Sequence, residues 1–93
     1  MIDFDKYQKE VHHFLHVTQM NFKLVSIYEF KSISELIMEK SSSHYFRQAR
    51  KGNKFESVFG YAMARYKNYI YMVKETSSGV VCIEIELYEE QSK

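Results

Sequence analysis

Residues 69–87 constrain the fold more than any other part of the sequence. Two runs in this segment alternate with a period of two, and the Thr-Ser-Ser-Gly stretch at 76–79 separates them. A period of two places successive side chains on opposite faces of a strand, and small polar residues with glycine favour a turn. The pattern predicts a β-hairpin with one face in the core, in which Cys82 is a packing residue.

The length of the chain limits it to one domain. Its 93 residues allow one modest core, and 45% of them are hydrophobic, including 15 Phe and Tyr. This composition argues against intrinsic disorder. We therefore expect residues 1–93 to form a single small domain, with a frayed tail at 91–93.

Apolar spacing predicts a first helix over 5–20. Its apolar residues recur at three- and four-residue steps, and Asp5 with Gln8 resembles a capping box. The β-rich run that follows, FKLVSIYEF at 22–30, predicts a short strand.

Serines mark the starts of the next two helices. Ser32 and Glu35 form a second capping box, which predicts a helix that ends near the serines at 41–43. A short helix is expected at 44–51, and Gly52 would end it.

The spacing of apolar residues in the next segment predicts the clearest helix of the chain, over 54–68. They recur at three- and four-residue steps through about three turns, which indicates one buried face. These residues are Phe55, Val58, Phe59, Ala62, Met63 and Tyr66. The opposite, exposed stripe is expected to hold Lys54, Tyr61, Arg65 and Asn68.

The expected order of elements is helix, strand, helix, short helix, long helix and hairpin, which defines an α+β domain. This α-β-α-α-α-β-β order resembles that of a winged helix-turn-helix domain with one extra turn before the recognition helix. The resemblance is one of layout without a residue motif, and many small α+β folds have a similar order. It implies that 54–68 is the recognition helix.

The formal net charge of +1 conceals an uneven distribution. Residues 41–74 carry seven Lys and Arg against Glu56, whereas residues 75–93 carry five Glu against Lys93. A basic middle followed by an acidic end indicates two faces of opposite potential. Alternatively, the two segments lie side by side and neutralise each other.

The basic segment makes a nucleic-acid-binding regulator the leading hypothesis, with DNA or RNA as the partner. Lys and Arg neutralise phosphates, Arg and Asn pair with base edges, and Tyr stacks or bonds a phosphate. Helix 54–68 would meet a groove, while upstream cations and Lys74 at the hairpin hold the backbone. The expected nucleic-acid-binding residues are Arg47, Arg50, Lys51, Lys54, Ser57, Tyr61, Arg65, Asn68 and Lys74.

Aromatic residues within the basic segment support a second nucleic-acid hypothesis, that of a single-strand binder with stacking platforms. The alternative role of these side chains is to fill the core of a chain without Trp. They are Tyr45, Phe46, Tyr66, Tyr69 and Tyr71.

A protein-binding inhibitor is the alternative function. The composition is rich in Lys, Ile, Tyr and Ser, as in phages and mobile elements of low-GC hosts, whose short genes often encode antagonists of host proteins. The partner would then be a host nucleic-acid-processing or defence enzyme, with acidic residues mimicking phosphate against its basic channel. These acidic residues are Glu84, Glu86, Glu89 and Glu90.

Catalysis is not expected from this sequence. Gly52, Gly60 and Gly79 are isolated, and neither G-x-S-x-G nor H-E-x-x-H occurs. We therefore expect a protein that is not an enzyme and needs no cofactor.

His12 and His16 have the spacing of a helical metal-binding pair, but the glutamate of the zincin pattern is replaced by His13. We expect no metal site.

The charged start and the lack of an apolar run of 18 residues predict a cytoplasmic protein without membrane contact. A chain this small also admits a homodimer, paired through the hairpin edge or the N-terminal helix.

Overall fold

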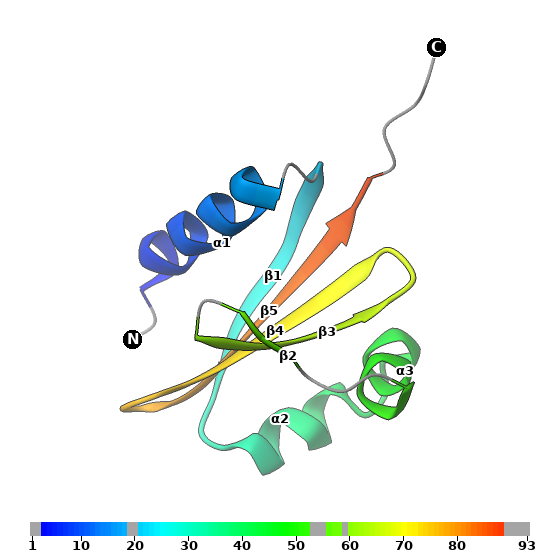
Figure 1. Ribbon diagram of the computed structural model, residues 1–93. Coiled ribbons are helices and arrows are strands. Elements are labelled where there is room, and N and C mark those ends of the chain that lie inside the picture. The colour runs from blue at the N-terminus through cyan, green and yellow to red at the C-terminus, as the bar shows by residue number, and fades with distance from the viewer. Residues whose placement is uncertain (1–2, 19–20, 53–55, 59, 89–93) are drawn as a thin grey trace.

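A computed structural model describes residues 3–18, 21–52, 56–58 and 60–88 (Figure 1). The chain forms a small compact α+β domain, which confirms the predicted class. Its elements are α1 (Phe4–Thr18), β1 (Phe22–Phe30), α2 (Ile33–Lys40), α3 (His44–Gly52), β2 (Glu56–Val58), β3 (Tyr61–Tyr66), β4 (Tyr69–Thr76) and β5 (Gly79–Leu87). The tail at 91–93 lies outside the described residues.

The strands form one antiparallel sheet in the order β1-β5-β4-β3-β2. The predicted hairpin supplies two interior strands, because β5 and β4 are the second and third strands from the β1 edge. β1 pairs with β5 along nearly its whole length, from Phe22 opposite Leu87 to Phe30 opposite Val80, with an irregularity between Leu24 and Ser26. The first and last strands in sequence are therefore neighbours.

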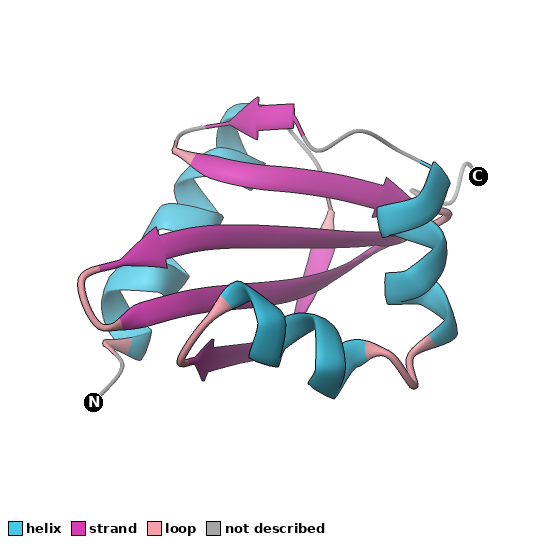
Figure 2. Cartoon of the chain, turned by 90° about the horizontal axis from the view of Figure 1, so that it is seen from below, coloured by secondary structure: helices cyan, strands magenta, loops and turns pink. Residues whose placement is uncertain are grey.

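Helices cover both faces of this sheet (Figure 2). α1 buries Tyr7, Val11, Phe14 and Leu15 against one face, in the first core. The sheet contributes Ile27, Tyr61, Ile70, Met72, Val81, Ile83 and Ile85 to this core.

The second core lies on the opposite face, under α2 and α3. Leu36 of α2 and Phe46 and Ala49 of α3 pack there on the sheet. The sheet residues of this core are Phe30, Ala64, Tyr71, Val73, Val80 and Cys82. The prediction that the hairpin buries one face is therefore wrong, because β4 and β5 supply side chains to both cores.

The prediction of a helix over 54–68 is also wrong. Its described part forms β2, a turn at Gly60, and β3. Gly60 has φ +82, a left-handed conformation that suits glycine in a tight turn and is foreign to a helix interior. A second turn follows at Lys67, with φ 55.

The helical spacing in 54–68 arose because a strand covered on both faces carries apolar side chains at adjacent positions. In β3, Tyr61 and Met63 belong to the first core, whereas Ala62 and Ala64 belong to the second. Phe55, Phe59 and the side chain of Val58, which contributed to the helical pattern, lie outside the described residues. With strands in this segment, the observed order departs from α-β-α-α-α-β-β, and a winged-helix topology is not confirmed.

The local start signals of α2 and α3 are confirmed. Ser32 Oγ accepts a hydrogen bond from the Glu35 amide at 3.1 Å, and the Glu35 carboxylate accepts one from the Lys31 amide at 3.2 Å. Ser43 Oγ accepts from the Phe46 amide at 3.2 Å, so this serine caps α3.

The start of α1 differs from the prediction. The helix begins at Phe4, and the Asp3 carboxylate accepts a hydrogen bond from the Lys6 amide at 3.1 Å. Asp3 therefore takes the capping role that was expected of Asp5. Among the described helices, none has the length and apolar character needed to cross a membrane.

Candidate functional site

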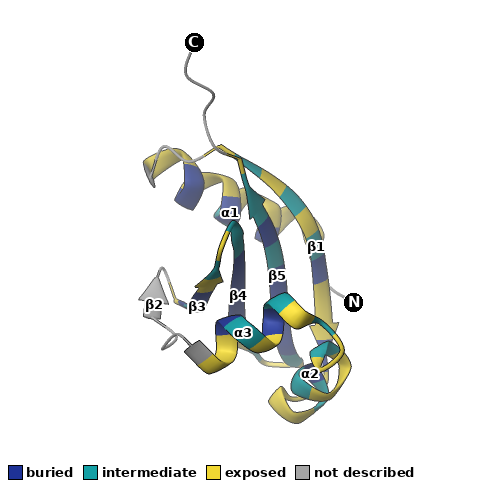
Figure 3. Ribbon diagram, turned by 90° about the vertical axis from the view of Figure 1, so that its right-hand side faces the viewer, coloured by how far each residue is buried: buried dark blue, intermediate teal, exposed yellow. Residues whose placement is uncertain are grey.

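α3 turns part of the basic segment into a surface. Its sequence, HYFRQARKG, contains no acidic residue. Phe46 and Ala49 are buried in the second core, whereas Arg47, Arg50 and Lys51 are exposed. Figure 3 shows α3 with both buried and exposed residues beside the sheet. Among the described residues, none of these three cations forms a salt bridge. Three of the nine expected nucleic-acid-binding residues thus share one accessible surface, called here the basic surface of α3.

Four rings form an aromatic cluster where the start of α3 meets the β3–β4 turn. Tyr45 is its hub, with ring centroids 5.4 Å from Tyr66 and 4.7 Å from Tyr69. His44 lies 5.9 Å from both Tyr45 and Tyr66. All four contacts are edge-to-face, the arrangement favoured by aromatic quadrupoles, and each contact contributes about 0.5–1.5 kcal/mol beyond burial.

The aromatic cluster remains accessible and carries a cation. His44 is exposed, and the three tyrosines are half-buried. The Lys67 ammonium lies 5.5 Å from the Tyr66 ring centroid, within the range of a cation–π contact. By contrast Phe46 and Tyr71, whose rings are 5.3 Å apart, are buried in the second core. The five aromatics of the basic segment therefore divide into two buried residues and three half-buried rings, which pack against the second core and stay partly accessible.

The expected acidic strand is engaged within the molecule. Glu84 accepts hydrogen bonds from Tyr71 Oη at 3.3 Å and Ser26 Oγ at 3.5 Å, and lies 3.4 Å from Lys40 Nζ. Glu86 accepts one from the side-chain amide nitrogen of Asn68, Nδ2, at 3.2 Å. Burial, reinforced by the nearby Glu84 charge, raises the pKa of Tyr71 to about 12. Glu89 and Glu90 lie outside the described residues.

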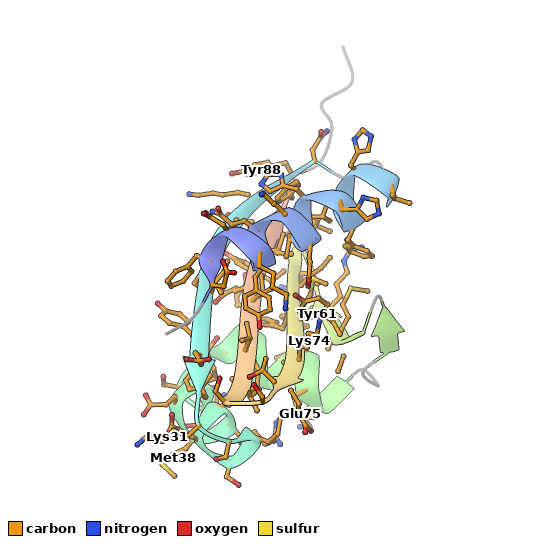
Figure 4. All side chains as sticks on the ribbon, turned by 90° about the vertical axis from the view of Figure 1, so that its left-hand side faces the viewer. Lys31, Met38, Tyr61, Lys74, Glu75 and Tyr88 are labelled. Atoms are coloured by element: carbon orange, nitrogen blue, oxygen red, sulfur yellow. The ribbon has the colours of Figure 1, made fainter. Side chains whose placement is uncertain are left out.

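Tyr61 and Lys74 lie on the opposite side of the sheet, under α1 (Figure 4). The Tyr61 side chain, expected to be exposed, is 2% accessible and donates a hydrogen bond to Glu10 Oε1 at 2.6 Å. Burial and then this hydrogen bond raise the pKa of Tyr61. Lys74 Nζ lies 3.7 Å from the same Glu10 oxygen and 5.1 Å from the Tyr61 ring centroid. The structure therefore separates both residues from the basic surface of α3.

The remaining expected residues are dispersed. Arg65 is exposed on β3, where its Nε donates to the Lys67 carbonyl at 2.7 Å. Asn68 is tied to Glu86 in the β3–β4 turn. Lys54 and the side chain of Ser57 lie outside the part of the molecule that the structure describes. The predicted helical stripe is therefore wrong for its described members, because Tyr61 is buried in β3, Arg65 is exposed on the same strand and Asn68 lies in the following turn.

Sequence analysis missed His44 and Lys67 as site residues. Both are basic or titratable side chains directly beside a tyrosine, in the pairs His44-Tyr45 and Tyr66-Lys67. That adjacency was the available signal, but only the packing of α3 on the β3–β4 turn brings the two pairs together.

Metal-ligating side chains do not gather in the described ranges: no group of three His, Cys, Asp or Glu is placed to hold an ion. His12 and His16 are exposed on α1, and the His12 ring packs edge-on against Phe22, with centroids 5.0 Å apart.

We predict that Cys82 is unreactive in the folded protein. Its side chain is 1% accessible in the second core, and burial raises the pKa of the thiol to about 12. Ellman's reagent at about pH 8 should label the thiol only after addition of guanidinium, because reaction needs an accessible thiolate. Rapid stoichiometric labelling of the native protein would contradict the described packing.

The function of the site is inferred from the chemistry of its side chains. No family model, curated protein or solved structure matches this chain. The candidate site is the basic surface of α3 together with the aromatic cluster and Lys67. It combines exposed cations with accessible aromatic rings, two groups that bind the phosphates and bases of nucleic acids.

Proposed function

We propose that this chain is a non-enzymatic nucleic-acid-binding protein whose contact surface is the candidate site. The observation that carries the proposal is the exposure of Arg47, Arg50 and Lys51 on a helix without acids, beside accessible tyrosines. Cations that are not neutralised within the protein release counterions when they meet phosphates, which drives association.

The distribution of charge pairs supports this surface over the acidic one. Lys40 and Lys74 each lie close to a carboxylate, and Glu84 and Glu86 each accept hydrogen bonds from neighbouring strands or turns. Glu10, Glu84 and Glu86 are thus engaged in contacts within the molecule. The cations of α3 have no such partner among the described residues.

A protein-binding inhibitor is the second candidate, and exposed apolar side chains favour it. Met38 and Ile33 of α2 are 70% and 40% accessible, and Tyr28 of β1 is 51% accessible. Apolar side chains rimmed by polar ones are typical of protein contacts. This function becomes the first choice if the protein shows no affinity for nucleic acid.

We predict that Arg47→Glu combined with Lys51→Glu removes nucleic-acid binding. Both side chains are exposed, so the fold should persist, while two attractive contacts become repulsive. The control is Lys23→Glu with Lys31→Glu, which changes the net charge equally at exposed positions of β1 and the following loop. Fluorescence anisotropy with labelled oligonucleotides at about 50 mM salt measures both, and circular dichroism confirms the fold.

Salt dependence provides the second readout. If the three cations of α3 each contact a phosphate, affinity for a single strand should fall about 18-fold between roughly 50 and 200 mM salt, and for a duplex about 40-fold. If the α3 variant and its control lose nucleic-acid affinity equally, net charge alone drives binding. Lack of wild-type binding to duplex DNA, single-stranded DNA and RNA in low salt would refute the function.

A further inference from the structure

We propose, on the basis of this proposed function, that the ligand is single-stranded and that a base stacks at the His44–Tyr66 end of the aromatic cluster. In this arrangement Lys67 and Arg47 hold the phosphates on either side of the stacked base.

The arrangement of the rings selects that end of the cluster. Tyr45 contacts three other rings, so it is held between them and acts as a positioning residue. His44 is exposed at the first residue of α3, and Tyr66 is half-buried at the last residue of β3. Their ring planes are inclined at 82°, so one ring braces the other by its edge. Such bracing presents a ring without the cost of ordering it on binding.

Acidic residues limit the site on its other side. Tyr69 lies directly opposite Glu86 in the register of β4 and β5, and Glu84 lies two residues away on β5. Burial, followed by the charges of Glu86 and Glu84, raises the pKa of Tyr69. Phosphates would be repelled from that side of the cluster. A bound strand is therefore directed away from Tyr69, toward His44 and the basic surface of α3.

Cations flank the proposed stacking position. The Lys67 ammonium lies 5.5 Å from the Tyr66 centroid, and in the proposed complex it moves from the ring to a phosphate when a base stacks there. Arg47 follows His44 by three residues, which makes the two neighbours on the surface of α3. Lys51 continues the same line one turn farther on, since residues four apart also adjoin. A strand leaving the rings would thus follow the helix over successive cations.

The fold favours an unpaired strand over a duplex. Bases within a duplex are stacked on each other and do not offer their faces to a tyrosine or histidine. α3 is nine residues long and packs against β3 and β4, beside the β3–β4 turn (Figure 1). The His44 and Tyr66 rings therefore add nothing to duplex binding, whereas they can stack on a base of a single strand.

Two variants test the stacking, namely Tyr66→Leu and His44→Ala. Each should weaken binding to a labelled single-stranded oligonucleotide by at least about fivefold, the lower end for a stacked base, and should leave the salt dependence unchanged. Phe4→Leu is the control, because Phe4 is a 50% accessible aromatic on α1, which covers the opposite face of the sheet. His44→Ala removes an exposed side chain, so it remains informative if Tyr66→Leu impairs folding.

Comparison of ligands separates this inference from the function on which it rests. The wild type should prefer single-stranded DNA or RNA to a duplex of the same length, and binding should quench tyrosine fluorescence less in Tyr66→Leu. Matched DNA and RNA strands show whether the 2′-hydroxyl contributes. If α3 charge reversal abolishes binding while Tyr66→Leu and His44→Ala bind like the wild type, the stacking inference is overturned and the function stands. If neither the α3 charge-reversal variant nor the two ring variants lose affinity, both the stacking inference and the proposed function are overturned.

Discussion

Replacing Gly79 with alanine should lower the free energy of unfolding by at least about 3 kcal/mol, enough to threaten a small domain. Gly79 begins β5 with φ +154, and a Cβ there would collide with the carbonyl oxygen of Phe30. The atoms it meets are backbone, so they cannot turn aside as a flexible side chain would. Relief requires separation of the end of β1 from the β4–β5 turn.

Gly60→Ala is the matched control for this prediction. Gly60 also has a positive φ, +82, but nothing lies within 4 Å of the position of its Cβ. Only the backbone strain applies there, which costs about 1–2 kcal/mol. Urea denaturation of both variants measures the difference in their free energies of unfolding. Equal decreases in this free energy would show that β1 does not approach Gly79 closely.

The second large effect is expected for Leu15→Ala. Leu15 is completely buried between α1 and the sheet, so its truncation should cost about 2–5 kcal/mol through lost burial and a cavity. Val17→Ala is the control on the same helix, because Val17 is 57% accessible and its truncation should change stability by less than about 0.5 kcal/mol. Similar thermal melts for the two variants would contradict the packing of α1 on the sheet.

Elements defined by local interactions were predictable from the sequence. The Ser32–Glu35 capping box lies within four residues, and Ser32 Oγ accepts the expected hydrogen bond from the Glu35 amide. The Glu35 carboxylate accepts its bond from the Lys31 amide, one residue before the expected Ser32 amide. The hairpin of β4 and β5 was also predictable, because its turn residues at 76–79 directly join the two alternating strands. In both cases the residues that determine the structure are adjacent in the chain, so no knowledge of the tertiary fold is needed.

The segment 54–68 was mispredicted because its structure depends on distant partners. The helical spacing assumed that one face is buried, whereas β3 has α1 on one side and α3 on the other. Burial on both faces removes the contrast between apolar and polar positions that distinguishes a strand from a helix. Gly60 was the contrary local signal, since glycine is unfavourable within a helix.

The candidate site was predictable to the extent that it lies on one helix. Arg47, Arg50 and Lys51 share α3, whose register against the core follows from Phe46 and Ala49. The position of Tyr61 was mispredicted because residues 61–66 were expected to be helical, whereas they form strand β3. Tyr66 and Lys67 became part of the site because α3 packs on the β3–β4 turn, a contact that no local pattern specifies.

The pairing of β1 with β5 has a consequence for how the chain acquires its structure during translation. Phe22 emerges from the ribosome 65 residues before its partner Leu87, so β1 has no strand to bind until most of the chain has been made. Until then the apolar side chains of β1 and α1 are exposed to chaperones or to other nascent chains. Completion of the sheet is therefore late, because the pairing of β1 with β5 joins strands distant in sequence, and such contacts slow folding compared with a helical bundle of this size.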